Sequence, residues 1–354
     1  MKNGAIVGFG RLASGAGRNQ EVFPKIWQPH SIMGGINSLP NATLRAVCDP
    51  NLELMNQLDE GISKYADHKD LLEREDLDFL AIATRAPMRL KIATDAINAG
   101  CKRLHLEKPL CNDSKTLESF QSLLDQSETI FTYGALRRLL EPYSLIKGLI
   151  ESKKFGSLSE IRFNYGVSGL FWSHTHTIDL ILFFIESNAM VQEITGKSSP
   201  ITFKVANNLL FIESDPTISE LTISFSNNQI ARITSSPEMS IDFYFDKGLL
   251  KICDDGRSVV FIPLLGDSEF KGTLWQEDEF RGIGGFAAPI DLLIISRIET
   301  LERRPDIHRN MKDAVLGQEI LFKIAEKLFL DQNPRIKLPK NPIFLGLGPT
   351  NQPA

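Results

Sequence analysis

Two histidines and an aspartate stand close together in the stretch FWSHTHTIDL, residues 171–180. Imidazole titrates near neutral pH, so a histidine such as His176 suits proton transfer. If the segment from Thr177 to Ser187 is helical, His176 stands at its start, and Asp179 lies one turn further along on the same side. We therefore take His176 as a candidate acid–base residue, with His174 and Asp179 as candidate substrate contacts.

A metal site is one alternative for this stretch. On a helix, His174 and His176 would point about 200° apart, because the period is about 3.6 residues. They could share an ion only on extended backbone, and no cysteine or carboxylate is placed as a third ligand. We expect no metal. Another alternative, two histidines satisfied by hydrogen bonds near a domain interface, fits His174 better than His176.

A glycine-rich turn ends the first apolar run, GAIVGFGRLA. Gly8 permits a tight turn, Gly10 lets the backbone approach a pyrophosphate, and Ala13 is small enough for helix–strand packing. Backbone N–H groups at a helix start would face the phosphates. The alternative is an ordinary glycine turn between strand and helix. The predicted cofactor contacts in this turn are Gly8, Phe9, Gly10, Arg11 and Leu12.

An acidic residue, Asp49, ends the second apolar run, TLRAVCDP. A carboxylate there accepts hydrogen bonds from ribose hydroxyls and repels a 2′-phosphate, so we expect NAD, with NADP disfavoured. Asp49 lies further from the glycines than the usual ~20 residues. The surplus falls in residues 14–30, which we interpret either as a flap over the ligand or as surface decoration, with a helix restarting in HSIMGGINS.

Strands and helices alternate through the first part of the chain. DFLAIAT and KRLHLEKPL read as a third and a fourth buried strand. LELMNQLDEGISKYA has helical spacing, and PMRLKIATDAINAGC reads as a helix that stops at Gly100. This order predicts a Rossmann-type, doubly wound parallel sheet in a dinucleotide-binding domain over residues 1–134.

The motif HLEKPL, residues 105–110, together with the glycine turn, resembles the Gfo/Idh/MocA family, the glucose–fructose oxidoreductase and inositol dehydrogenase group. The resemblance extends over nearly the whole chain. YGALRRLLEPYSLIKGLIESKKFGSLSEI is similar to the family's segment entering the second domain. HTIDLILFF is similar to its active-site helix, and RRPDIHRNMKDAVLGQEILFKIAEKL to its closing helix.

The resemblance assigns roles to residues of this chain. Lys108 matches the catalytic lysine at the nicotinamide, which hydrogen-bonds the reacting hydroxyl, and Pro109 matches a proline that often follows a cis bond. A lysine beside Glu107 in a cleft can have a tuned charge. His176 matches the family's catalytic histidine, and Asp179 an aspartate one turn on. The cofactor contacts implied outside the glycine turn and Asp49 are Thr84, Arg85, Pro87, Glu107 and Lys108.

Three positions depart from the family pattern. Trp172 stands where the family usually has an aspartate that shares the substrate hydroxyls with the histidine. Leu136 precedes the arginine pair in place of asparagine, and Arg89 replaces a common histidine. Trp172 and Phe171 could stack on a sugar ring or a base, or belong to the core.

Four arginines fall in segments expected at the cleft. Arg85 and Arg89 flank Pro87 after the third strand, where parallel-sheet proteins bind ligands, and Arg137 and Arg138 begin the second domain. Together they could receive a phosphate or carboxylate bidentately, or they could form surface ion pairs. The predicted substrate contacts are Arg89, Lys108, Arg137, Trp172, His174, His176 and Asp179.

Residues 135–354 change pattern to short alternating strands with Asn and Gly turns. They predict a substrate-binding and oligomerisation domain of the α+β class, with a large open, mainly antiparallel sheet. In the family, such a face serves self-association. We expect a homodimer or homotetramer.

Composition narrows the classes of protein. A net charge of −5 argues against nucleic-acid binding, and the longest apolar runs are too short to cross a bilayer. The N-terminus shows no signal-peptide pattern, and the four cysteines form no CxxC pair, so we expect a cytoplasmic protein.

The sequence therefore predicts an NAD-dependent oxidoreductase that acts on a CH–OH group of a sugar, cyclitol or nucleotide-linked sugar. Two alternatives stay open. One is a non-catalytic sensor of dinucleotide or sugar levels on the same fold, supported by Trp172. The other is an oxidoreductase for a non-sugar substrate.

Overall fold

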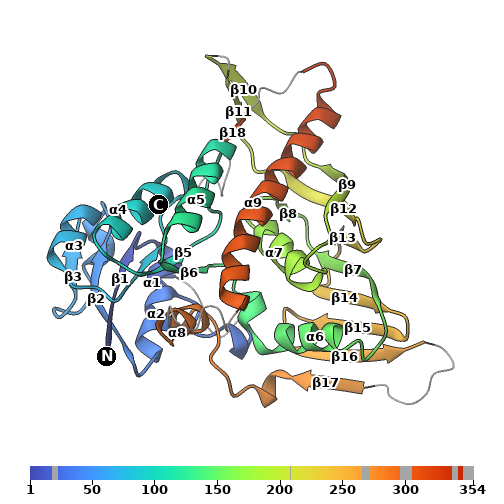
Figure 1. Ribbon diagram of the computed structural model, residues 1–354, viewed down its shortest axis with the longest axis horizontal. Helices are drawn as coiled ribbons and strands as arrows, with labels where there is room; N and C mark the ends of the chain where they lie inside the picture. The colour runs from blue at the N-terminus through green and yellow to red at the C-terminus, as the bar shows by residue number, and fades with distance from the viewer. Residues whose placement is uncertain (18–22, 208, 265–271, 296–304, 337–341, 346–354) are drawn as a thin grey trace. The chain divides into compact units, whose positions relative to one another are not determined.

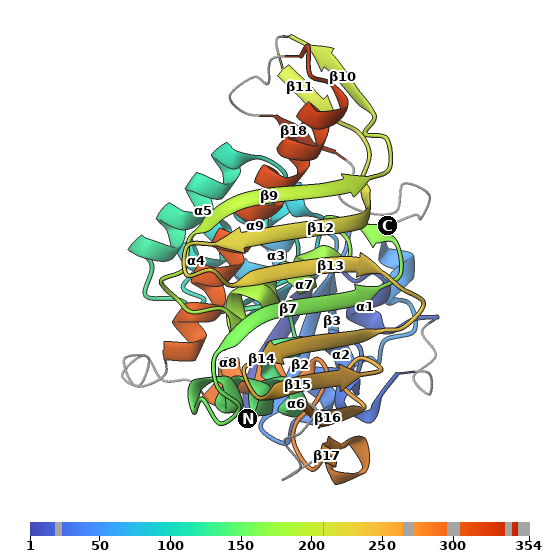
Figure 2. The ribbon, with the colours of Figure 1, turned by 90° about the vertical axis from the view of Figure 1, so that its right-hand side faces the viewer.

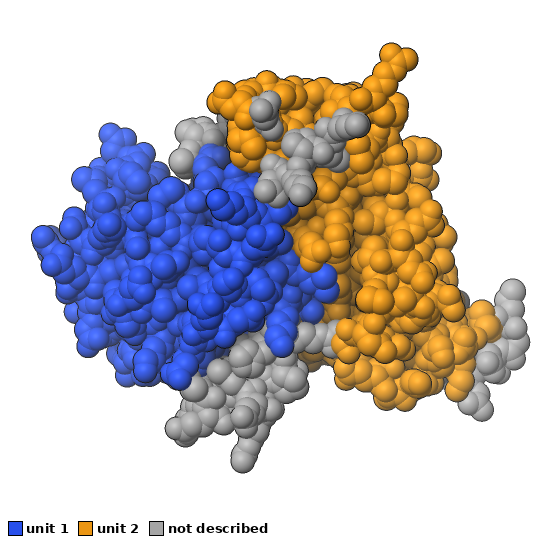
Figure 3. Space-filling view, turned by 45° about the horizontal axis from the view of Figure 1, so that its top comes forward, with its two compact units in different colours: residues 1–136, 283–316, 353–354 blue, residues 137–282, 317–352 orange. Residues whose placement is uncertain are grey.

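The computed structural model describes residues 1–17, 23–207, 209–264, 272–295, 305–336 and 342–345. These residues form two compact units, coloured in Figure 3. Unit 1 contains residues 1–136 and 283–316, and unit 2 contains the described residues of 137–282 and from 317 onward. Neither unit is a single continuous stretch of chain.

Unit 1 is built on a parallel sheet with the strand order β3-β2-β1-β4-β5-β6 (Figure 1). The strands are continuous apolar runs because helices cover both faces, and β4 and β6 are buried at every position. The four strands expected from sequence are confirmed. The bounds are β1 Lys2–Val7, β2 Ala42–Cys48, β3 Ser63–Tyr65, β4 Phe79–Ile82, β5 Arg103–Leu106 and β6 Ile130–Tyr133.

Helices lie on both sides of this sheet, with α3, α4 and α5 on one side and α2 and α8 on the other (Figure 1). Helix α4 starts with a proline in its first turn, and Gly100 follows its end at a φ of 90°. The bounds are α1 Arg11–Ser14, η2 Lys25–Trp27, α2 Ile32–Ser38, η3 Leu52–Met55, α3 His68–Arg74, α4 Ala86–Asn98, α5 Ser114–Gln126 and α8 Ala287–Ile295.

The helix expected in residues 52–66 is wrong. The segment forms only the short η3, and its end becomes β3, which pairs in parallel with β2. The side chain of Asn51 accepts the N–H of Glu53 and starts the turn, while Met55 is the residue of that turn that reaches the core. Pairing with the sheet edge outweighs the helical spacing of the apolar residues.

Part of the inserted loop packs against a distant segment of unit 1. Gly285 N–H donates to the Ile26 carbonyl and Phe286 N–H to the Pro29 carbonyl, both at 2.8 Å. Helix α8 follows directly and packs on α2, where a Cβ on Gly35 would lie 2.6 Å from the Phe286 backbone. The expected restart of the helix as α2 is confirmed. Residues 18–22 of the insertion lie outside the described residues.

Unit 2 is built on a mixed sheet of nine strands among the described residues, in the order β17-β16-β15-β14-β7-β13-β12-β8, with β9 also paired to β12. All neighbours are antiparallel except β13 and β7. Figure 2 shows its open face. The bounds are β7 Leu158–Tyr165, β8 Ser168–Gly169, β9 Val191–Ser198, β12 Thr217–Phe225, β13 Ile230–Ser235, β14 Ser240–Phe245, β15 Gly248–Cys253, β16 Ser258–Pro263 and β17 Gly272–Gln276.

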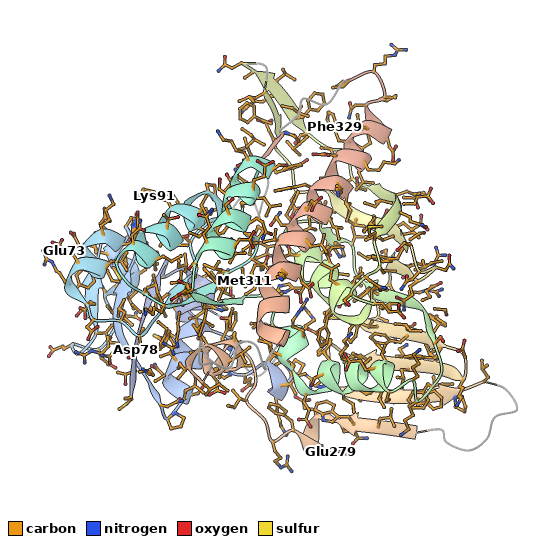
Figure 4. The ribbon with its side chains drawn as sticks, viewed as in Figure 1. Glu73, Asp78, Lys91, Glu279, Met311 and Phe329 are labelled. Atoms are coloured by element: carbon orange, nitrogen blue, oxygen red, sulfur yellow. The ribbon has the colours of Figure 1, made fainter. Side chains whose placement is uncertain are left out.

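Helices cover the other face of this sheet. Phe184 of α7 packs edge-on against Phe243 of β14, with ring centroids 4.7 Å apart. A small second sheet has the order β10-β11-β18, and Phe329 of α9, labelled in Figure 4, packs edge-on against Phe203 of β10. The remaining bounds are η4 Arg137–Leu139, α6 Glu141–Glu151, α7 His174–Phe184, β10 Phe203–Ala206, β11 Leu209–Ile212, η5 Glu277–Glu279, α9 Pro305–Gln332 and β18 Ile343–Phe344. The predicted fold class is confirmed.

Candidate functional site

The turn after β1 has one glycine enclosed by backbone and one that faces open space. Gly8 has a φ of 90°, and a Cβ there would lie 2.7 Å from the Thr84 backbone nitrogen. Gly10 has nothing within 4 Å of the position of its missing Cβ. The first glycine is therefore required by the fold, while the second leaves room for a group to approach the backbone.

The neighbouring residues of this turn face different ways. The side chain of Phe9 is 2% exposed and belongs to the core, so only its backbone lines the turn. Leu12 is packed against the same core. Arg11 is exposed at the start of α1, where its Nη2 donates to the Gly17 carbonyl at 3.4 Å. Of these three side chains, Arg11 is the exposed one.

Asp49 lies at the carboxyl end of β2 and contacts the turn directly. Its Oδ2 accepts the N–H of Phe9 at 2.7 Å, and its Oδ1 accepts the N–H of Asn51 at 2.9 Å. A carboxylate next to the glycine turn is the arrangement that accepts ribose hydroxyls in dinucleotide-binding folds. The open space at Gly10 and the position of Asp49 fit NAD.

The ends of β4 and β5 supply the remaining cofactor-side residues predicted from sequence. Thr84 is half-buried after β4, and Arg85 and Pro87 are exposed where α4 begins. After β5, Glu107 is buried and Lys108 is partly exposed, and the Lys108–Pro109 peptide is cis. Unit 1 therefore brings these residues to the carboxyl ends of neighbouring strands, where parallel sheets bind ligands.

Arg89 is enclosed on the inner side of α4. Its side chain is 4% exposed, and its Nη2 donates to the Thr84 carbonyl at 2.5 Å. Burial lowers the pKa of this guanidinium to about 10, which leaves it charged at neutral pH. Arg89 therefore contacts the backbone beside the predicted site from within the protein.

In unit 2, the two histidines lie on the first turn of α7 and differ in environment. His174 is buried, and its ring nitrogens lie 3.1 Å from Ser168 Oγ and 3.2 Å from Thr177 Oγ1. Burial lowers the pKa of His174 to about 4, so its ring is neutral at physiological pH. His176 is partly exposed. The helix starts at His174, three residues earlier than expected from sequence, because Asp215 holds the preceding backbone.

Asp215 is a positioning residue that the sequence did not indicate. Its two carboxylate oxygens accept the N–H groups of Phe171 and Trp172 at 2.8 and 2.9 Å. Phe171 is buried against Phe344, whereas Trp172 is 51% exposed. The two aromatic residues thus separate, one into the core and one toward solvent.

The remaining predicted substrate residues of unit 2 take part in internal ion pairs. Arg137 donates through Nε and Nη2 to the carboxylate of Asp255 at 2.8 and 2.9 Å. Arg138 makes a bidentate pair with Asp179. The ion-pair alternative for these two arginines is therefore realised, inside the unit and not on its surface. The assignment of Arg137 and Asp179 to substrate stays a prediction.

Neither a metal-binding cluster nor a membrane-spanning helix occurs among the described residues. Within these ranges, no group of three or more His, Cys, Asp and Glu side chains is arranged to hold a metal ion. No described helix combines the length and apolarity needed to cross a lipid bilayer.

Residues 2–135 match the model of the oxidoreductase family with an NAD-binding Rossmann fold, Gfo/Idh/MocA. This match confirms the resemblance and the expected NAD cofactor. No curated protein matches the chain in sequence.

Solved structures share the fold over nearly the whole chain. A dehydrogenase from Chromobacterium violaceum is 16% identical with a TM-score of 0.69, and the match covers 94% of this chain and 97% of that one. The WlbA dehydrogenase from Bordetella pertussis, solved with NADH and UDP-GlcNAcA, is 16% identical with a TM-score of 0.66, covering 92% and 96%. Myo-inositol 2-dehydrogenase from Lactobacillus plantarum is 16% identical with a TM-score of 0.64, covering 93% and 98%.

Proposed function

Since residues 2–135 belong to the Gfo/Idh/MocA oxidoreductase family, we propose that this protein transfers a hydride between a nicotinamide cofactor and a CH–OH or keto carbon of a sugar, cyclitol or nucleotide-linked sugar. The observation that carries the proposal is Lys108. It is a partly exposed lysine at the end of β5, directly after the buried Glu107 and on the strand ends that also carry the glycine turn and Asp49.

Oxidation of an alcohol removes a hydride and a proton. NAD, when bound, accepts the hydride, so the protein's own residues handle the proton and the charge on oxygen. In the proposal, Lys108 and His176 divide these two roles, one stabilising the developing oxyanion and the other taking the proton. The neutral, enclosed His174 contributes to the packing of α7 in place of proton transfer.

The substrate in this proposal is a nucleotide-linked sugar or a uronate. Arg85 and Trp172 support it, because both side chains are exposed beside predicted site residues. A guanidinium pairs with phosphate or carboxylate, and an indole stacks on a sugar ring or a base. The Bordetella pertussis dehydrogenase was solved with such a sugar, UDP-GlcNAcA.

We also propose that the enzyme is a cytoplasmic homodimer or homotetramer. Support comes from the open face of the unit 2 sheet (Figure 2), where Arg162 and Arg232 both pair with Glu160. Charged groups on such a face can give a contact with a second copy its specificity and register.

The experiment is an activity screen with the purified protein. UDP-sugars, uronates, free sugars and cyclitols are offered with NAD, and NADH formation is followed by absorbance. Wild type should turn over a member of the first two groups, and Lys108→Ala should lose orders of magnitude in kcat while still binding NADH. Tight NADH binding without turnover of any substrate would favour the sensor alternative, and turnover that survives Lys108→Ala would refute the catalytic assignment.

A further inference from the structure

Two polar side chains lie inside unit 1, on the face of the parallel sheet that α8 covers. His105 of β5 is in register with Thr132 of β6, so the two side chains share a face. Ile130, two residues before Thr132, belongs to the core that α2 and α8 form on this face. Helix α8 packs against both strands (Figure 1). His105 is 0% exposed and Thr132 1%, so water does not reach them.

The ring of His105 faces a polar group with each of its nitrogens. Nδ1 lies 3.0 Å from Oγ1 of Thr132, and Nε2 lies 3.5 Å from Oε1 of Glu107. In a neutral imidazole, one nitrogen donates and the other accepts. Because a carboxylate only accepts, the hydrogen belongs on Nε2, and Nδ1 then accepts the hydroxyl hydrogen of Thr132. Thr132 thereby selects the tautomer that offers a donor to Glu107.

The contact between His105 and Glu107 is longer than a formed hydrogen bond, which measures about 2.7–3.2 Å for N–H···O. Among the described residues, neither Nε2 of His105 nor Oε1 of Glu107 has another hydrogen-bond partner. A buried polar atom without a partner is costly, and these two atoms face each other. Hydrogen bonds of this kind tighten when a ligand completes a catalytic site. Each atom is therefore the partner available to the other.

The second oxygen of the Glu107 carboxylate contacts Lys108. Oε2 accepts the backbone N–H of Lys108 at 3.2 Å. Glu107 is 2% exposed, and a Cβ on Gly134 would lie 2.6 Å from either carboxylate oxygen. Only glycine at position 134 leaves room for the carboxylate where it lies. The carboxylate thus has the ring of His105 at one oxygen and the backbone of Lys108 at the other.

We propose that His105 is a positioning residue for Lys108: held by Thr132, its ring orients the Glu107 carboxylate, and that carboxylate holds the Lys108 backbone. The inference deepens the proposed function and rests on it only in taking Lys108 as the catalytic residue. Aliphatic side chains would suit these two buried strand positions equally well, so the packing of the sheet does not require the polar pair of His105 and Thr132.

The first test identifies the tautomer of His105. The chain has six histidines, and the ring signals of His105 in a protein with 15N-labelled histidine are those missing from His105→Gln. The 15N chemical shifts distinguish a ring nitrogen that carries hydrogen from one that does not, and we expect the hydrogen on Nε2. A hydrogen on Nδ1 alone would turn a lone pair toward the carboxylate and would overturn the proposal.

The second test measures hydrogen exchange at the backbone amide of Lys108, which needs no substrate. His105→Leu removes the donor, so exchange should become roughly tenfold faster. His105→Gln keeps an N–H donor and should stay near wild type. Thr94→Val is the matched control, because it removes a hydroxyl that donates to the Leu90 carbonyl on α4. Amides of β4 report any general loosening of the sheet.

Two results of the exchange experiment contradict the proposal. One is an unchanged rate in His105→Leu. The other is an equal increase in His105→Leu and His105→Gln, which would assign the effect to packing. If wild type turns over none of the tested sugars, the proposed function fails, but the exchange rates still decide whether His105 positions Lys108.

The third test is kinetic. His105→Leu should lower kcat by roughly 10- to 100-fold with little change in KM, and His105→Gln should recover most of it. Thr132→Val, a milder change that folds where His105→Leu does not, should lower kcat by a smaller factor, and Thr132→Ser should recover it. Combined with His105→Leu, Thr132→Val should cause no further loss, because both act through one contact. Additive losses in kcat, or an effect on KM alone, would overturn the proposal.

Discussion

Arg138 and Asp179 form a bidentate ion pair inside unit 2, with Nε–Oδ2 at 2.9 Å and Nη2–Oδ1 at 2.7 Å. The Nη2 of Arg138 also donates to the backbone carbonyl of Asp179 at 2.9 Å, and both side chains are 3% exposed. The pair joins η4, where unit 2 begins, to the helix that carries His176. Asp179 therefore anchors α7 within unit 2.

Removal of one member of this pair should destabilise the protein strongly. Asp179→Ala leaves a buried guanidinium without its carboxylate, for which we expect a loss of about 3–5 kcal/mol in the free energy of unfolding. Asp179→Asn keeps the shape and should lose less. Urea unfolding measures both. A stable Asp179→Ala protein with only a raised KM would show that substrate binding is the main role of this residue.

The two glycines of the turn after β1 should respond differently to alanine. Gly10→Ala adds a methyl group in open space, so the unfolding temperature should stay near that of wild type while NADH binding falls at least tenfold. Gly8→Ala places a Cβ against the Thr84 backbone at a positive φ and should destabilise the fold by about 1–3 kcal/mol. Thermal unfolding and NADH titration of both variants check this. Unimpaired NADH binding by Gly10→Ala would place the cofactor elsewhere.

Asp49 should decide the choice between NAD and NADP. Asp49→Ala should weaken NADH binding by roughly 10- to 100-fold, because a charged hydrogen-bond acceptor is lost. The difference in affinity between NADH and NADPH should therefore become smaller. Asp49→Asn is the control, since its amide oxygen can still accept the N–H of Phe9 and preserve the turn. Fluorescence titration with both nucleotides measures the two affinities. Equal wild-type affinities would refute the assignment.

His174 and His176 should separate stability from chemistry. The pKa of His174 is lowered from 6.5 to about 4 by burial, so the unfolded chain takes up this proton first as the pH falls. The stability that depends on neutral His174 is complete above about pH 6.5 and is lost toward pH 4, by about 3 kcal/mol in total. Urea unfolding at about pH 7 and pH 5 measures this loss. In His174→Gln the free energy of unfolding should differ less between the two pH values than in wild type, whereas His176→Gln should show the wild-type difference.

For kcat we expect the larger effect at His176 and the smaller one at His174. His176→Ala should lose orders of magnitude in kcat and change the pH–rate profile, because it removes a group proposed to exchange the proton. His174→Ala should reduce kcat less, in proportion to its loss of folded protein. A larger kcat loss in His174→Ala would mean that the two histidines are assigned the wrong way round.

Arg85 should confer a preference for charged substrates. Its side chain is exposed, whereas that of Arg89 is enclosed. Arg85→Ala should raise KM for a sugar phosphate or uronate by about tenfold, and leave KM for the neutral parent sugar unchanged. Arg89→Ala, compared in the same assay, should not show this selectivity. No charge preference in wild type would end the idea.

Much of unit 1 could be predicted from sequence because its signals are local. The apolar runs of β1, β2, β4 and β5, the glycine turn and the glycine after α4 all lie within short windows. Residues 52–66 could not, because the choice between helix and strand there depends on pairing with β2. The sequence analysis also did not predict β6, or that α8 belongs to unit 1. The residues of α8 carry no local signal that assigns them to one unit or the other.

The partners of the site residues were the least predictable part. Arg137 pairs with Asp255, 118 residues away, and Arg138 with Asp179, 41 residues away. The role of Asp215 in holding the backbone before α7 depends on a contact over 44 residues. The sequence shows which charged residues are present and how they are spaced. Only the folded structure shows which of these charges are paired with an opposite charge.

The contact between residues 26–29 and 284–286 has a consequence for the order of folding during synthesis. The apolar surface of α2 is covered by α8, which the ribosome makes only after residues 137–282 of unit 2. The nascent N-terminal domain therefore waits with an incomplete core, exposed to chaperones and to aggregation, until residue 295 has emerged. A fragment that stops at Leu136 should show the same exposure permanently, and this protein cannot be divided into independently folding halves by a single cut.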